Sequence, residues 1–355
     1  MSDFNVGPEL VCPACAGELI ERASYECSTC RRSYPVVAGI LDLRLAPDRY
    51  LSLADDRRKA ERIAAIDGTA ADLVEAYWAM TPEVPPNLAA SYRKNAAWSV
   101  GRGAAVVDRL QAMSTNSLLD VGCGTGGLVV AAAQRGMQAT GIDVALRWLV
   151  VCARLAKDHN VSARFISADG SLPPFRLESF DFVTCIETLE HAADPRGTLQ
   201  RSIALSKVKF LAVSANRFSA APDPTLNLMM TGFLPRSLAA SYVRRRRKTG
   251  AVNYAPPSTA EINAWLGPSR DGAMRTKVTA SVLPPVSADA SGLRRRGVHF
   301  HDQIVNGRLE PFVRMCAPMI EVSVAGVGDG PDIDDVGGVG GTARIPSDMP
   351  PVNSR

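Results

Sequence analysis

The sequence predicts an α/β fold in which helices cover both faces of a doubly wound, mainly parallel sheet. Between residues 117 and 216, short apolar runs alternate with helical patterns, as is typical of parallel strands joined by crossover helices. The stretch LLDVGCGTGG (118–127) predicts a buried strand followed by a tight glycine turn into a helix. The chain has 355 residues, of which 46% are hydrophobic, so it is long enough for about two domains.

The chain divides into four segments. Residues 1–45 hold four of the eight cysteines and predict a small metal-binding module. Residues 46–115 predict a helical linker or cap, whose last helix runs over residues 87–113. Residues 116–326 predict the α/β domain. Residues 327–355 lack apolar periodicity, and we expect them to be disordered.

Within the α/β domain, the runs SLLDV, QATGID, ARFISAD, FDFVTCIE and KVKFLAVSAN predict five strands in chain order. The helix after the glycine turn is expected to stop at Gly136. Residues 217–257 then form an insertion rich in Pro, Met and Arg. Ser258 and Glu261 fit a capping box at the start of the next helix.

Three aspartates stand at the carboxyl ends of the first three predicted strands, where open α/β sheets bind ligands. Asp143 is placed to accept hydrogen bonds from a ribose, and Asp169 to meet an adenine amino group. Asp120, beside the glycine turn, would repel a pyrophosphate. S-adenosylmethionine has no phosphate and carries an ammonium and a sulfonium, so we expect it as the nucleotide. A plain strand–helix turn with solvated aspartates is the alternative.

The motifs LLDVGCGTGG, GID, SADG and FDFVTCIETLEHAADP together resemble the class I S-adenosylmethionine-dependent methyltransferases over residues 117–216. That resemblance implies a seven-stranded Rossmann-like sheet whose last strand runs antiparallel. The runs at 275–284 and 319–326 would supply its final two strands.

The resemblance also implies where the cofactor lies. The glycine turn and Asp120 would hold the methionine end, Asp143 the ribose and Asp169 the adenine, with Ile186 and Glu187 near the methyl group. The residues expected at the cofactor are Asp120, Gly122, Cys123, Gly124, Gly126, Asp143, Val144, Asp169, Gly170, Ile186 and Glu187.

Two CxxC turns, Cys12–Cys15 and Cys27–Cys30, predict a structural zinc site, because four thiolates complete a tetrahedral shell and leave no open position. A module of about 45 residues could hardly fold without a bound metal ion. Disulfides or chance pairing are the alternatives. The segment is similar to the zinc ribbons fused ahead of bacterial methyltransferases, including the ribosomal-RNA guanine-N1 enzymes, and to zinc-ribbon activator subunits. The guanine-N1 enzymes have a histidine where this chain has Cys30.

The net charge of +4 does not require a nucleic acid or a membrane surface as partner, although arginines cluster at 243–248 and 293–297. The sequence shows no signal peptide and no apolar run long enough to span a membrane, so we expect a cytoplasmic protein with reduced thiols. The arginines at Arg244–Arg247, with Lys248, either grip phosphate or an anionic glycan or form a solvated helix face.

Methyl transfer to a hydroxyl needs a base, and ETLEH offers Glu187, Glu190 and His191. His191 is the preferred base because its ordinary pKa is near neutral. An equal alternative is that Glu190 and His191 only cap or support the next helix. The sequence lacks the (Asn/Asp)-Pro-Pro-(Tyr/Phe) pattern of amide and adenine-N6 methyltransferases. We therefore expect methylation of a small molecule, glycan or specialised metabolite, at oxygen. An RNA methyltransferase and a non-catalytic cofactor-binding partner subunit are the alternatives.

Overall fold

The computed structural model describes residues 10–22, 24–82, 84, 86–111, 116–222, 228–247, 254–267, 274–281, 303, 310 and 314–326. Three of the expected features lie outside these residues. They are the disordered tail at 327–355, the arginine cluster at 293–297 and Lys248.

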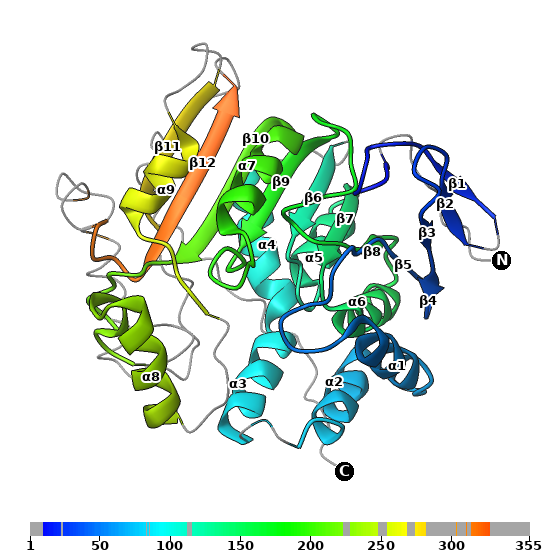
Figure 1. The fold of residues 1–355 in the computed structure, drawn as a ribbon, viewed down its shortest axis with the longest axis horizontal. Coiled ribbons are helices and arrows are strands. Elements are labelled where there is room, and N and C mark those ends of the chain that lie inside the picture. The colour runs from blue at the N-terminus through cyan, green and yellow to red at the C-terminus, as the bar shows by residue number, and fades with distance from the viewer. Residues whose placement is uncertain are drawn as a thin grey trace.

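In the described part of the chain, nine strands form one mixed sheet with the order β11-β12-β10-β9-β6-β7-β8-β5-β4 (Figure 1). These strands are β4 (Val36–Val37), β5 (Ile40–Asp42), β6 (Ser117–Val121), β7 (Gln138–Asp143), β8 (Arg164–Ser167), β9 (Phe180–Ile186), β10 (Ser206–Ala215), β11 (Met274–Ala280) and β12 (Met319–Gly326). β12 is antiparallel to both β10 and β11. The five strands from β10 through β9, β6 and β7 to β8 are parallel to one another. The seven expected strands and the reversed last strand are therefore confirmed.

The sheet is wider than expected because two strands from the first segment join its edge. β5 pairs parallel with β8, where Leu41 is opposite Ile166 and Asp42 is opposite Ser167, and β4 pairs antiparallel with β5. Leu41 is fully buried. The apolar residues of β5 cannot be covered by so small a module alone, so they extend the core of the sheet.

The remaining part of the first segment, residues 10–34, is called here the cysteine module. It contains a separate antiparallel sheet of β1 (Leu19–Glu21), β2 (Tyr25–Cys27) and β3 (Ser33–Tyr34). An isolated bridge from Leu10 to Phe175 joins the module to the loop after β8.

The helices are α1 (Leu53–Ala64), α2 (Ala70–Ala79), α3 (Pro86–Ala97), α4 (Ser99–Leu110), α5 (Gly127–Gln134), α6 (Leu146–Asp158), α7 (Pro195–Leu205), α8 (Arg236–Arg247) and α9 (Thr259–Leu266), with a short 3-10 turn at Thr231–Phe233. α5 ends just before Gly136, and the Ser258–Glu261 capping box is present at α9, as expected. The helix expected over 87–113 is instead divided at Trp98 into α3 and α4. The division lets α4 pack closely on α5, where a Cβ on Gly103 would lie 2.4 Å from the Leu128 backbone.

Successive residues of the strands point into two different cores, as the two-residue period of a strand requires. Leu118 packs in a core with residues of α1, α2, α4, α5 and α6. Leu119 packs in the opposite core with residues of α7, α9 and the cysteine module. Both faces of the sheet are therefore covered, which leaves its carboxyl edge to bind a ligand. Among the helices that the structure describes, none is long and apolar enough to cross a membrane.

Candidate cofactor and acceptor site

The glycine loop between β6 and α5 is held in a conformation that favours glycine. Gly122, Gly124 and Gly126 have φ angles of 74°, 53° and 79°. A Cβ on Gly122 would lie 2.3 Å from the Thr188 side chain, and one on Gly126 would lie 2.8 Å from Cβ of Cys152. The loop therefore packs directly against the segment after β9 and against α6, with no room for a side chain at either glycine.

Asp143 joins this loop to the end of β7. Its Oδ2 accepts a hydrogen bond from the backbone N–H of Gly124 at 2.9 Å, and its Oδ1 accepts one from Ala145 at 2.8 Å. Burial raises the pKa of Asp143 above its ordinary value, although these two N–H groups and the charge of Arg147 act in the opposite direction. The carboxylate is thus held in a fixed orientation at the edge of the sheet.

Asp120 is buried in β6, with 4% of its surface exposed. Burial raises its pKa to about 7, a hydrogen bond from Oγ1 of Thr184 at 2.8 Å opposes that rise, and the nearby charge of Asp143 adds to it. A carboxyl in this state is ionised most easily when a cation lies beside it. A cationic ligand at this edge would therefore gain an ion pair with Asp120.

Asp169 and Gly170 follow β8. One oxygen of Asp169 accepts hydrogen bonds from the N–H and the hydroxyl of Ser171, both at 2.8 Å. A Cβ on Gly170 would lie 2.8 Å from the Val121 side chain, so this turn packs closely on the end of β6. The structure thus brings Asp120, Asp143 and Asp169 to the ends of three neighbouring strands.

Ile186 ends β9, and Glu187 follows it with a φ of 55°, a conformation that few non-glycine residues adopt. The half-exposed carboxylate of Glu187 lies 3.8 Å from Nη1 of Arg102 on α4. Arg102 could not be predicted from the sequence, because no local motif connects it with Glu187, which follows 85 residues later.

Glu190 and His191 have different surroundings. Glu190 is 2% exposed, and its oxygens accept hydrogen bonds from Oγ of Ser214 at 2.8 Å and from the N–H of Ala215 at 3.1 Å. Burial raises the pKa of Glu190 to about 7, while those two donors lower it. The His191 ring is half-buried, and its centre lies 5.3 Å from that of Tyr254, near the end of the 217–257 insertion. Glu190 therefore contacts the protein interior, whereas His191 meets the insertion.

The four cysteines of the cysteine module come together as expected, with all sulfur atoms within 4.8 Å of one another. Sγ of Cys12 lies 3.7 Å from that of Cys30, and Sγ of Cys15 lies 3.4 Å from that of Cys27. Tetrahedral zinc with bonds of about 2.3 Å requires sulfur atoms roughly 3.8 Å apart. Burial raises the pKa of Cys27, but N–H groups of Cys30 and Thr29 and the thiol of Cys15 outweigh it and lower the pKa to about 6. The thiols fit a zinc ion.

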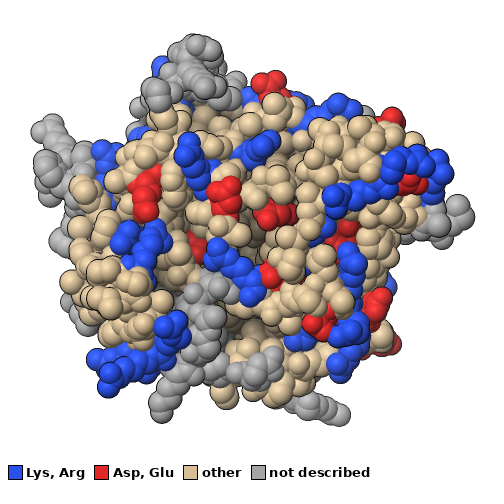
Figure 2. Space-filling model, viewed as in Figure 1, with Lys and Arg blue, Asp and Glu red and all other residues tan. Residues whose placement is uncertain are grey.

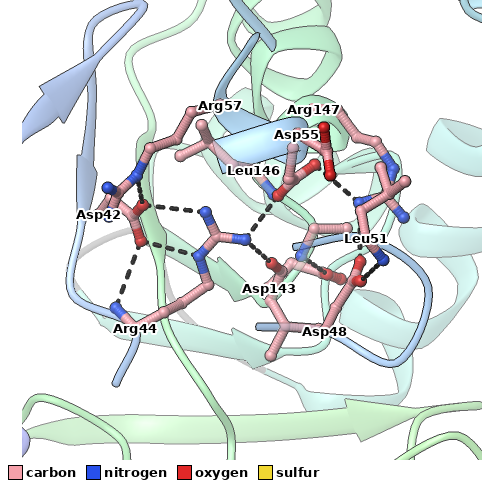
Figure 3. A network of polar contacts seen from close by, with 12 residues as sticks. Asp42, Arg44, Asp48, Leu51, Asp55, Arg57, Asp143, Leu146 and Arg147 are labelled. Atoms are coloured by element: carbon pink, nitrogen blue, oxygen red, sulfur yellow. Dashed lines mark hydrogen bonds and ion pairs between the residues drawn. The ribbon is translucent and has the colours of Figure 1, made fainter. Parts of the chain in front are cut away.

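A second missed feature lies behind Asp143, where buried arginines and aspartates from β5, α1 and α6 meet (Figure 3). This group could not be predicted from the sequence, because its residues are far apart in the chain and belong to none of the motifs described above.

A family model described as a methyltransferase domain matches residues 119–205. A ubiquinone biosynthesis O-methyltransferase from Pseudomonas fluorescens is 39% identical over 169 residues, which are 47% of this chain and 65% of that protein. The protein of the same name from Paracidovorax citrulli is 34% identical over 203 residues, which are 56% of this chain and 78% of that protein. The chain thus spans roughly two thirds of the length of the first of these relatives.

Among solved structures, magnesium protoporphyrin IX methyltransferase from Synechocystis PCC 6803 is similar with a TM-score of 0.42 and 13% identity, over 76% of this chain and 94% of that one. The matched domain covers the glycine loop and all three strand-end aspartates. The chain belongs to the class I S-adenosylmethionine-dependent methyltransferases.

Proposed function

We propose that the protein transfers a methyl group from S-adenosylmethionine to an oxygen atom of a small molecule. The observation that carries this proposal is a hydrogen bond at the carboxyl ends of the neighbouring strands β6, β7 and β8. There Asp143 accepts a hydrogen bond from the N–H of Gly124 in the glycine loop. Two relatives that carry the name O-methyltransferase support oxygen as the methylated atom.

In this proposal the cofactor lies across the three strand ends. Asp143 accepts hydrogen bonds from the ribose, Asp169 meets the adenine, and Asp120 faces the ammonium group. The Arg102 guanidinium, at present 3.8 Å from Glu187, is placed to pair with the methionine carboxylate. The proposed contacts along the walls are Gly122, Cys123, Gly124, Gly126, Val144, Gly170, Ile186 and Glu187.

Methyl transfer requires the protein to align the acceptor oxygen with the methyl group and to provide a proton acceptor. The methyl group passes to the attacking oxygen in an in-line displacement, the bond from carbon to sulfur breaks, and the acceptor hydroxyl loses its proton. We assign that proton to His191, whose ring is half-buried beside Tyr254. Glu187, directly after β9, is the other candidate base. Glu190 does not take the proton itself in this proposal, because its two oxygens already accept hydrogen bonds from Ser214 and Ala215. It would act only by holding the segment that bears His191.

Zinc has a structural role in this proposal. Cys12, Cys15, Cys27 and Cys30 would supply four ligands and leave no position for a substrate. The buried side chains of Tyr25 and Tyr34 belong to the same core as strands of the main sheet. The metal would therefore stabilise the cysteine module where it packs on that sheet.

The experiment that tests the proposal measures transfer of tritium from labelled S-adenosylmethionine to a panel of catechols and other hydroxylated small molecules, to glycans and to RNA. We expect extractable labelled product from a small molecule, lost in His191→Ala. Surface variant Asp108→Ala is the control, since Asp108 pairs with Arg135 away from the carboxyl edge. Cofactor binding without transfer to any acceptor would support a non-catalytic partner subunit.

Methyl incorporation into RNA would favour the RNA methyltransferase instead. The exposed arginines of α8, Arg244, Arg245 and Arg246, lie at the opposite end of the long axis from the cysteine module (Figures 1 and 2). A single RNA contact would have to extend across the molecule to use both. RNA affinity that falls steeply with salt and is lost when these arginines are reversed to glutamate would contradict our choice.

A further inference from the structure

We propose that three buried residues, Arg44, Asp56 and Arg147, are positioning residues for the cofactor. They hold the segment from Asp143 to Arg147 and so fix the carboxylate assigned to the ribose. This inference rests on the proposed cofactor site, but it concerns residues of the chain that belong to none of the cofactor motifs.

Asp56 of α1 is fully buried and accepts hydrogen bonds from both arginines of the group. Its Oδ2 accepts hydrogen bonds from Nη1 of Arg44 at 2.5 Å and from the backbone N–H of Leu146 at 3.0 Å. Its Oδ1 accepts one from Nη1 of Arg147 at 2.7 Å. One carboxylate thus binds both arginines and the backbone of the segment after β7.

The bond to Leu146 replaces a missing helix cap. α6 begins at Leu146, and its N-cap residue Ala145 has no side chain that can accept a hydrogen bond. Asp56, 90 residues earlier in the chain, supplies that acceptor and places a negative charge at the positive end of the helix. The start of α6 therefore depends on α1 for its capping.

Arg44 holds the same segment from the other side. Its Nη1 donates to the carbonyl of Val144 at 2.7 Å, while Nε and Nη2 bind the two oxygens of Asp42 at 2.8 and 2.9 Å. Val144 and Leu146 flank Ala145, whose N–H binds Asp143. Contacts on both sides of Ala145 restrict how far the Asp143 carboxylate can turn.

The positive and negative charges of the group balance, and this matters because an unpaired buried charge would strongly destabilise the fold. Arg147 also binds Asp48 at 2.7 Å, and Arg57 binds Asp42 at 2.8 Å from the more exposed side. Burial would raise the pKa of Asp42, but the hydrogen bonds and charges of Arg44 and Arg57 lower it below its ordinary value. Asp42 therefore stays ionised and paired.

The group also connects the N-terminal strands with the cofactor edge. Arg44 follows β5, whose neighbour β8 ends just before Asp169, and the N–H of Leu43 binds the carbonyl of Ser167 at 2.8 Å. The segment before α1 thus binds the backbone at the ends of both β7 and β8, the strands that carry the proposed ribose and adenine positions.

The test is a double-mutant cycle on binding of S-adenosylhomocysteine, measured by calorimetry at a temperature well below unfolding. We expect Asp56→Asn to raise the Kd roughly tenfold in the wild-type background and much less in an Asp143→Ala background, since residues acting as one unit are not additive. Arg57→Gln is the matched control, because Arg57 belongs to the same group but does not contact residues 143–147, and we expect its Kd to stay at the wild-type value.

If Asp56→Asn does not fold, Arg44→Lys carries the test, because lysine keeps the charge but cannot bind Asp42 and Val144 together. A folded variant with wild-type Kd and only a lower Tm would overturn the inference, as would additive effects of Asp56→Asn and Asp143→Ala. A wild-type protein that does not bind S-adenosylhomocysteine would count against the proposed function instead.

Discussion

Asp143 accepts a hydrogen bond from the backbone N–H of Gly124, 19 residues away in the chain, at 2.9 Å. This bond connects the loop after β6 with the end of β7, so the two elements that bear the cofactor motifs form one rigid corner. Its second bond, from Ala145, extends the corner to the start of α6. A ligand at this corner meets a carboxylate that is already oriented.

Cofactor affinity should rise with pH in the acidic range. Burial raises the pKa of Asp120 to about 7, so the carboxyl is mostly protonated at pH 5 and must lose its proton to pair with the ammonium group. As the pH rises from 5 to 7, we expect the Kd for S-adenosylmethionine to fall by up to about tenfold per pH unit. Above pH 7 the Kd should level off. Calorimetry in buffers of different ionisation enthalpy should show proton release.

Asp120→Asn should flatten this profile, which separates Asp120 from Glu190, whose pKa is also raised to about 7. A wild-type Kd that does not change between pH 5 and 7 would remove Asp120 from the ammonium site.

Glu190 should make the unfolding free energy depend on pH. Its folded pKa of about 7 exceeds the ordinary value of 4.5, so its stabilising effect is complete below about pH 4.5 and is lost as pH rises through 7. Glu190→Gln, which cannot ionise, should therefore be more stable than the wild type at pH 8 by up to about 3 kcal/mol. Thermal unfolding at pH 5 and pH 8 checks this, and an advantage of the variant that is equal at both pH values would contradict it.

The cysteine module should carry one zinc ion. Cys27 is buried, and its pKa is lowered to about 6, as suits a thiolate ligand. We expect Cys27→Ser to lose the metal and lower the Tm, with Cys316→Ser as the control at an exposed cysteine outside the cluster. Elemental analysis that finds no zinc in protein purified without chelator would refute the site.

Local sequence patterns predicted much of this fold. The strand-end positions of Asp120, Asp143 and Asp169 follow from short apolar runs, and the Ser258 cap follows from its spacing to Glu261. These features depend on residues within a few positions of one another, which is the range over which periodicity and capping operate.

What the sequence did not predict depends on contacts between distant parts of the chain. The pairing of β5 with β8, the approach of Arg102 to Glu187 and the bond from Leu146 to Asp56 each join residues 85 or more positions apart. The break at Trp98 also lies close to a tertiary contact, since Gly103 of α4 packs against the Leu128 backbone of α5.

The most direct test of the cofactor site is a calorimetric titration of S-adenosylhomocysteine into the wild-type protein and Asp143→Ala, with Asp108→Ala as the control. A charge-assisted hydrogen bond is worth about 1.5–3 kcal/mol. We therefore predict one site per chain in the wild type and in Asp108→Ala, and a Kd raised roughly 10- to 150-fold in Asp143→Ala. No binding by the wild type, or equal affinity in Asp143→Ala, would contradict the assignment of this edge as the cofactor site.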